Sequence, residues 1–160
     1  MTCLAMPDTV FDKIRHLLDQ ENASFDVMEH EPVLTSEQAA EVRGTTLESG
    51  AKALICKADA DYVMAVMPAN LRLASKSIRK LKKWKKLRFA SADEVMELTG
   101  LLSGSIPPFG SLFGLTTFCD SQLVDQPRIN FNAGDRSISI SMASSDYLAV
   151  ENPELGPFAE

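Results

Sequence analysis

The chain has 160 residues, of which 45% are hydrophobic and 24% are charged, and its formal net charge is −6. This balance is typical of one soluble globular domain with a sizeable core, and no apolar run is long enough to cross a bilayer. Three widely spaced cysteines, Cys3, Cys56 and Cys119, argue against both a disulfide framework and a zinc site. The first residues lack the pattern of a secretory signal, so we expect a cytoplasmic protein.

The first third of the chain predicts two helices and a strand. The first helix is capped by Asp8, and its apolar residues recur at helical spacing: Val10, Phe11, Ile14, Leu17 and Leu18. A short strand is expected over residues 25–29. The next helix, over residues 36–43, is bounded by a capping box and a glycine stop: Thr35 with Gln38, and Gly44.

The middle of the chain predicts a hairpin and two further helices. Apolar runs over residues 51–56 and 62–67 flank a turn-like Ala-Asp-Ala-Asp segment. Ser75 is placed to cap a helix whose inward side chains are expected to be Ile78, Leu81 and Trp84. A strand over 87–90 follows, and then a helix over 91–100 that opens with a second capping box.

The last third predicts three strands and a helix. The strands cover residues 115–119, 129–132 and 136–142, and the last of these alternates between an apolar face and a serine face. A helix capped by Ser144 or Ser145 follows, ending at Val150. The interleaved order predicts a mixed α/β or α+β fold with one domain over residues 1–150 and a loose tail over 151–160.

The loop GLLSGSIPPFG, residues 100–110, has three glycines, two prolines and no charged side chain. Glycine lets a ligand approach the backbone closely, and proline stiffens the segment. The loop therefore either presents backbone groups to a ligand or forms a buried connection between two elements.

Basic residues are concentrated in one segment, Arg72–Arg88, which we call the basic segment. It holds nine of the 16 Lys and Arg residues and no acidic residue, so the rest of the chain has 7 basic against 22 acidic residues. Such a stripe on an acidic body is typical of a surface that binds a polyanion, although a solvated helix face has the same composition.

Two polar residues are candidates for a site. Lys52 interrupts an apolar strand, where it either extends along the sheet edge to solvent or points into a pocket to hold a carbonyl, carboxylate or phosphate oxygen. His30 follows a strand between Glu29 and Glu31, where it is either a structural residue or a ligand-binding imidazole.

The chain lacks the motifs of a hydrolytic triad, a metal site or a nucleotide triphosphate site. We therefore expect neither a metal nor another cofactor. An enzyme built from one lysine, backbone donors and polar side chains suits an activated bond such as an ester, for which orientation and oxyanion stabilisation suffice.

Four segments follow one another along the chain: EHEPVLTSEQAAEV with His30 and Thr35, GAKALIC with Lys52, the loop in ELTGLLSGSIPPFG, and FNAGDRSISI. In this order they resemble the YbaK/prolyl-tRNA-synthetase-associated (ProX-like) editing domain family, over about residues 8–150. The stretch RGTTLESGAKALICK, with IPPFG and FNAG, is most similar to the free-standing YeaK-like branch. The resemblance implies a mixed sheet or barrel core surrounded by helices.

The resemblance also implies a trans-editing enzyme that hydrolyses the ester of mischarged aminoacyl-tRNA with help from the terminal ribose hydroxyl. Lys52 and Gly104 take the positions of the catalytic lysine and loop. The residues expected to bind the aminoacyl end are Met28, His30, Thr35, Ser105, Pro108, Phe109, Asn132, Gly134 and Ser139. The residues expected to include the tRNA phosphate contacts are Lys76, Arg79, Lys80, Lys82, Lys83, Lys85 and Lys86.

Two departures bear on the amino acid removed. Met28 replaces a tyrosine of the YbaK branch, and Asn132 replaces a serine, so a small or hydroxylated amino acid is at least as compatible as cysteine. An aminoacyl-tRNA synthetase is a second candidate partner beside tRNA. The alternative function is a non-catalytic module that binds tRNA or a synthetase, but the retention of Lys52 and of the loop favours the enzyme.

Overall fold

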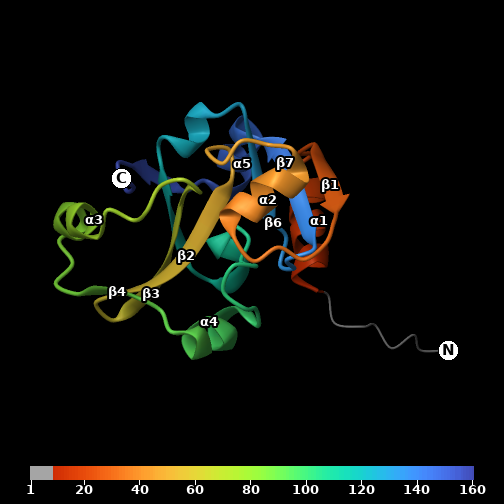
Figure 1. Ribbon diagram of the computed structural model, residues 1–160. Helices are drawn as coiled ribbons and strands as arrows, with labels where there is room; N and C mark the ends of the chain where they lie inside the picture. The colour runs from red at the N-terminus through yellow and green to blue at the C-terminus, as the bar shows by residue number, and fades with distance from the viewer. Residues whose placement is uncertain (1–8) are drawn as a thin grey trace.

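The computed structural model describes residues 9–160, whose strands form two sheets (Figure 1). The first sheet is antiparallel and has three strands in the order β1 (Phe25–Glu29), β7 (Ile138–Ala143) and β6 (Arg128–Asn132). The second has five strands in the order β4 (Leu87–Phe89), β2 (Ala51–Ala58), β3 (Asp61–Pro68), β5 (Thr116–Asp120) and β8 (Glu154–Gly156). Since β5 runs parallel to both β3 and β8, the second sheet is mixed.

Within residues 9–160 five α-helices surround the sheets, so the predicted mixed α/β fold is confirmed. They are α1 (Val10–Gln20), α2 (Ser36–Arg43), α3 (Ser75–Lys82), α4 (Ala92–Thr99) and α5 (Ser144–Glu151). Two short 3-10 turns, η1 (Gly110–Phe113) and η2 (Leu123–Asp125), were not predicted. The elements expected from periodicity and capping boxes are all present, with ends that match the prediction or shift by one or two residues.

The alternation predicted for β7 separates the core from a polar face. Ile140 and Met142 are fully buried in the core, where they are paired with Phe131 and Ile129 of β6. Ser139 points to the opposite face, as does its partner on β6, Asn132. This second face of the three-stranded sheet supplies polar groups to the site described below.

Two hydrophobic clusters hold the elements together. The larger lies between the sheets, α1 and α5, and it contains Phe109 packed edge-to-face against Phe131 and Tyr147. The smaller contains Ile78 of α3 and the aromatic pair Phe118 and Phe158. The basic segment is therefore anchored to the five-stranded sheet through the smaller cluster.

The ends of two helices differ from the prediction. Asp8 lies outside the described residues, and Thr9 caps α1 through a capping box with Asp12. Ser75 does not cap α3, because it is already the first helical residue, and its N-cap Ala74 offers no side-chain acceptor. Leu81, expected in the core, is 57% exposed because α3 ends at Lys82 after two turns.

The end of the chain is ordered, contrary to the prediction of a loose tail. The helix α5 is present, but Ser144 donates a hydrogen bond to the carbonyl of Gln126 instead of capping it. Strand β8 then pairs with β5, and Phe158 is buried in the smaller cluster. The carboxylate of Asp120 also accepts hydrogen bonds from two amides of this segment, those of Phe158 and Ala159.

Candidate functional site

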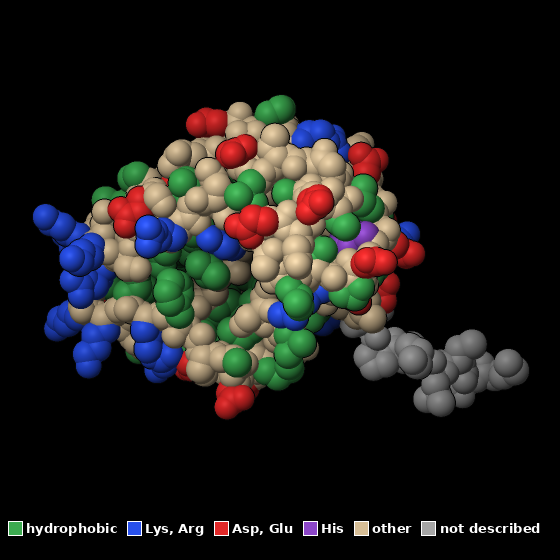
Figure 2. All heavy atoms as spheres, viewed as in Figure 1, with side chains coloured by type: hydrophobic (Ala, Val, Ile, Leu, Met, Phe, Trp, Pro, Cys, Tyr) green, Lys and Arg blue, Asp and Glu red, His purple; other side chains and the backbone are tan. Residues whose placement is uncertain are grey.

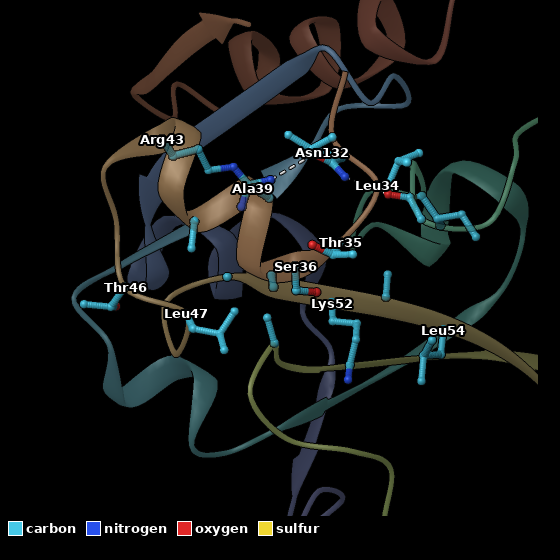
Figure 3. Close-up of a pocket in the computed structure, with 18 residues that line it drawn as sticks. Leu34, Thr35, Ser36, Ala39, Arg43, Thr46, Leu47, Lys52, Leu54 and Asn132 are labelled. Carbon is cyan, nitrogen blue, oxygen red and sulfur yellow. Dashed lines mark hydrogen bonds between the residues drawn. The ribbon is translucent and has the colours of Figure 1, made fainter. Parts of the chain in front are cut away.

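A cavity of about 170 Å³ lies where α2, the start of β2, the end of β6 and the 100–110 loop meet (Figure 3). Four residues predicted for the site line it: Thr35, Lys52, Gly104 and Asn132. The volume is below the roughly 300–1,000 Å³ of pockets for drug-sized ligands, so the cavity fits a small group. Its elements are far apart in sequence, and only the fold brings them together.

Lys52 lines the cavity, which favours the interpretation that this residue belongs to a pocket. Its ammonium donates a hydrogen bond of 2.5 Å to the carbonyl of Leu71. Burial lowers the pKa of Lys52 from its ordinary value, and the negative charge of Glu37 counteracts this in part. A lysine held by one neutral carbonyl retains two further N–H donors for a ligand.

The start of α2 forms one wall of the cavity. Thr35 accepts a hydrogen bond from the Gln38 amide, and the Gln38 side chain accepts hydrogen bonds from the amides of Leu34 and Thr35. This reciprocal capping box holds Thr35 and Ser36 against the cavity. Leu34, which is 74% exposed, lies at the rim.

Arg43, at the end of α2, was not among the predicted site residues, yet it lines the cavity. Its Nε donates to Ser139 Oγ at 2.8 Å, and its Nη2 donates to Asn132 Oδ1 at 2.9 Å. The Asn132 amide nitrogen in turn donates to the carbonyl oxygen of Gly104 at 2.6 Å. These hydrogen bonds connect α2 to strands β6 and β7 and to the 100–110 loop.

The loop is held from two sides at its exposed end. Asn132 binds the carbonyl of Gly104, and Arg136 donates to the carbonyl of Ser103 at 2.7 Å. Gly104 adopts a φ of +91°, a conformation that favours glycine. Within residues 9–160 the amides of Gly104 and Ile106 have no hydrogen-bond acceptor, and both residues line the cavity. They are available to donate to an oxygen of a ligand.

His30 and Ser139 lie behind Arg43 and do not line the cavity. The His30 Nε2 and Ser139 Oγ are 2.7 Å apart, and His30 Nδ1 is 2.7 Å from the carbonyl of Glu31. Since that carbonyl can only accept, Nδ1 carries the proton and Nε2 accepts from the serine hydroxyl in the neutral ring. Met28, opposite Ser139 on β1, is 41% exposed on the same face.

The four other predicted substrate-binding residues lie in or behind the loop, outside the cavity lining. Ser105 accepts a hydrogen bond from the amide of Gly134, and the Pro108 carbonyl accepts one from the hydroxyl of the buried Tyr147. Phe109 is a core side chain, and a Cβ at Gly134 would meet the side chain of Val10 in α1. The second half of the loop is therefore a buried connection, while its first half faces the cavity.

The basic segment forms a charged end of the molecule over α3 and the residues that follow it (Figure 2). Lys82 differs from its neighbours because it pairs with Glu154 at 2.9 Å and lies over the ring of Phe118. Seven basic residues of the segment are exposed and form no ion pair with any residue of 9–160: Arg72, Lys76, Arg79, Lys80, Lys83, Lys85 and Lys86.

Two features are absent from residues 9–160. No helix there has the length and apolar character needed to cross a membrane. Nor do three or more His, Cys, Asp or Glu side chains gather there in a way that could hold a metal ion.

Comparison with known families adds a match to the one described as the aminoacyl-tRNA editing domain, over residues 30–150. The chain belongs to this family. The matched range contains the cavity, the loop and the polar face of the three-stranded sheet. The resemblance predicted from the four sequence segments is therefore confirmed.

Individual relatives extend the match to nearly the whole chain. The "Multifunctional Ser/Thr-tRNA deacylase ProXp-y" of Escherichia coli (strain K12) is 36% identical over 99% of this chain and 98% of its own. An uncharacterized protein of Bacillus subtilis (strain 168), YwhH, is 30% identical over 83% and 85%. A crystal structure of a candidate trans-editing enzyme for prolyl tRNA synthetase has a TM-score of 0.85 at 21% identity, covering 97% of this chain and 99% of that one, and shows the same fold.

Proposed function

We propose that this editing domain deacylates tRNA that carries serine or threonine in error, acting in trans on the free aminoacyl-tRNA. Hydrolysis of an aminoacyl ester is the activity of the family to which the chain belongs. The relative from Escherichia coli is named for serine and threonine. The single observation that carries the finer proposal is the small cavity with a polar end formed by Arg43 and Asn132.

The proposed reaction needs few protein groups, because the ester is already activated. Water adds to the ester carbonyl while the neighbouring ribose hydroxyl assists its deprotonation. The carbonyl oxygen becomes an oxyanion. We assign its stabilisation to the amides of Gly104 and Ile106, which have no acceptor within residues 9–160 and belong to residues that line the cavity. The ribose oxygen then leaves with a proton, giving a free amino acid and an uncharged tRNA. Lys52 supplies the cation that holds the 3′ end at the mouth of the cavity.

The tRNA body is proposed to lie over the basic segment. Lys52 and Ala58 are six positions apart on β2, which corresponds to about 20 Å along the strand. Ala58 pairs with Leu87, which belongs to the basic segment. Phosphate contacts at that distance would position the acceptor stem while the single-stranded 3′ end reaches the cavity. Lys82 contributes less to phosphate binding than the other basic residues, because its ammonium is already paired with Glu154.

We propose a single deacylase domain that works in the cytoplasm without a cofactor. The family match spans residues 30–150, and β8, from the last ten residues, pairs with β5 at the edge of the five-stranded sheet. A synthetase partner is a separate proposal. The assay below should therefore be run with and without a synthetase.

The decisive test is deacylation of a panel of mischarged tRNAs by the purified protein. One tRNA body is charged in turn with serine, threonine, alanine and cysteine, and loss of the labelled amino acid is followed over time. We expect the seryl and threonyl esters to be hydrolysed fastest. Binding of all four without hydrolysis would instead identify a non-catalytic tRNA-binding module.

A further inference from the structure

We propose that Arg43 is the residue that determines specificity, by donating a hydrogen bond to the side-chain hydroxyl of the aminoacyl group. This inference rests on the proposed function, because it concerns the same cavity. It assigns a role to a side chain that was not among the predicted site residues, although Arg43 begins the stretch RGTTLESGAKALICK. Three observations support it: Arg43 has no anionic partner, it lies in the lining of the cavity, and its guanidinium is held in one orientation.

The charge of Arg43 is partly buried and has no anionic partner within residues 9–160. No carboxylate of residues 9–160 lies within ion-pair distance of it, and burial lowers its pKa to about 10. Its two hydrogen-bond partners, Ser139 and Asn132, are both neutral. Buried charges are normally paired or fully hydrogen-bonded, so an arginine left in this state beside a cavity points to an acceptor that the ligand brings.

The lining of the cavity has an exposed part and a buried part. Leu34 at the rim is 74% exposed, whereas Ala39 and Ala51 in the lining are buried. In Figure 3 Arg43 and Asn132 lie together on one side, and the ammonium of Lys52 points away from them. Arg43 lies one helical turn after the buried Ala39 on α2, and both residues line the cavity. Because the tRNA is far larger than the cavity, only the aminoacyl group enters it, and its side chain is the part that reaches Arg43.

The guanidinium is held in one orientation by the groups behind it. Nε and Nη2 are fixed by Ser139 and Asn132, and no acceptor within residues 9–160 binds Nη1. The Ser139 hydroxyl is itself committed to His30. An oxygen at Nη1 would therefore meet a donor already in place, with little loss of side-chain entropy on binding.

The chemistry of this donor favours a hydroxylated amino acid. Serine and threonine place a hydroxyl oxygen on the second side-chain atom, within the reach of a small cavity. An alanyl group has no acceptor there and leaves the guanidinium edge desolvated and unpaired. A hydrogen bond to a charged donor is worth about a 10- to 100-fold preference, and leaving the donor unpaired adds to the discrimination.

The test compares Arg43→Gln and Arg43→Lys with the matched control Arg128→Gln. Arg128 lies on β6, on the same face as Asn132, and its Nε donates to Ser141 as that of Arg43 donates to Ser139. Unlike Arg43, it is exposed, pairs with Asp26 and lies outside the cavity. One tRNA is charged in turn with serine, threonine and alanine, and kcat/KM is measured for each ester. Circular dichroism verifies folding.

We expect both Arg43 variants to lower the serine-to-alanine ratio of kcat/KM by about 10- to 100-fold, and the control to leave it unchanged. If wild-type protein hydrolyses none of the esters, the proposed function fails. If wild type is active and the folded Arg43 variants keep its serine-to-alanine ratio, only the role of Arg43 is overturned. Should Arg43→Gln fail to fold, the ratio measured for Arg43→Lys, which retains the charge, decides the role of Arg43.

Discussion

Lys52 and Lys57 belong to the same strand but have different surroundings, which makes them a matched pair. Lys52 reaches the cavity, whereas Lys57 lies over the ring of Tyr62. We expect Lys52→Ala to reduce deacylation by about 10- to 100-fold, because the hydrogen bond from its charged ammonium to the 3′ end is worth about 1.5–3 kcal/mol. Steady-state rates on the best ester measure this.

The Lys52→Ala variant should fold normally. The hydrogen-bond partner of its ammonium is the carbonyl of Leu71, and that residue is part-exposed, so water can replace the ammonium. Lys57→Ala should retain near-normal rates. Full activity in Lys52→Ala would show that the lysine has a structural role and that the catalytic assignment is wrong.

Gly104 and Gly100 form a second matched pair within one loop. Both have positive φ, +91° and +73°, so a valine at either position costs about 1–2 kcal/mol of backbone strain. The Gly104→Val variant should also lose activity, because its branched side chain stands where the ester approaches the backbone. Thermal unfolding and deacylation rates, measured on both variants, separate the two effects.

Gly100→Val should lose a similar amount of stability, since nothing lies within 4 Å of a Cβ at that position, while deacylation is retained. Equal rates for the two variants would contradict the view that the Gly104 backbone faces the substrate.

At the residue scale, four residues predicted for the site from the sequence line the cavity: Thr35, Lys52, Gly104 and Asn132. Arg43 was missed because its partners lie 89 and 96 residues away in the chain.

At the scale of elements, the helix caps test whether the start of α2 does more than stabilise the fold. Thr35 and Ser91 each cap a helix through a complete capping box, but only Thr35 lines the cavity. Each alanine substitution should cost about 1 kcal/mol and lower Tm by roughly 2–4 °C. The rate of deacylation should fall in Thr35→Ala alone.

The rescue variant for this test is Thr35→Ser, which keeps the hydroxyl that caps the helix. We expect it to recover both Tm and activity. A loss of activity in Ser91→Ala equal to that in Thr35→Ala would mean that helix stability, and not the wall of the cavity, limits the rate. The boxes themselves were predictable because a cap is a contact over three residues.

On the scale of the whole molecule, the charge distribution predicts where the tRNA lies. Lys80→Glu with Lys83→Glu reverses two exposed residues of the basic segment, and Lys13→Glu with Arg15→Glu makes the same change in net charge on α1, at the opposite side of the molecule in Figure 1. Losing two phosphate contacts should flatten the slope of log affinity against log salt by about 1.5 units. Titrations at several salt concentrations measure that slope.

Only the variant in the basic segment should change this slope, and hydrolysis of a minimal aminoacyl ester without the stem should be unaffected in both. Equal slopes for the two variants and wild type would leave the basic segment as a solvated face. Lys82 is excluded from this test because its reversal would place a second carboxylate beside Glu154 and disturb packing over Phe118.

The sequence by itself determined the helices and strands, the mixed fold class and the family. These depend on periodicity, on caps that span three or four residues and on motifs in a fixed order, all of which are local in the chain. The tertiary structure alone decided that Leu81 is exposed, that Lys82 is paired and that the last ten residues join a sheet. It also placed Arg43 against Asn132. These outcomes depend on which surfaces meet after folding, and no local pattern contains that information.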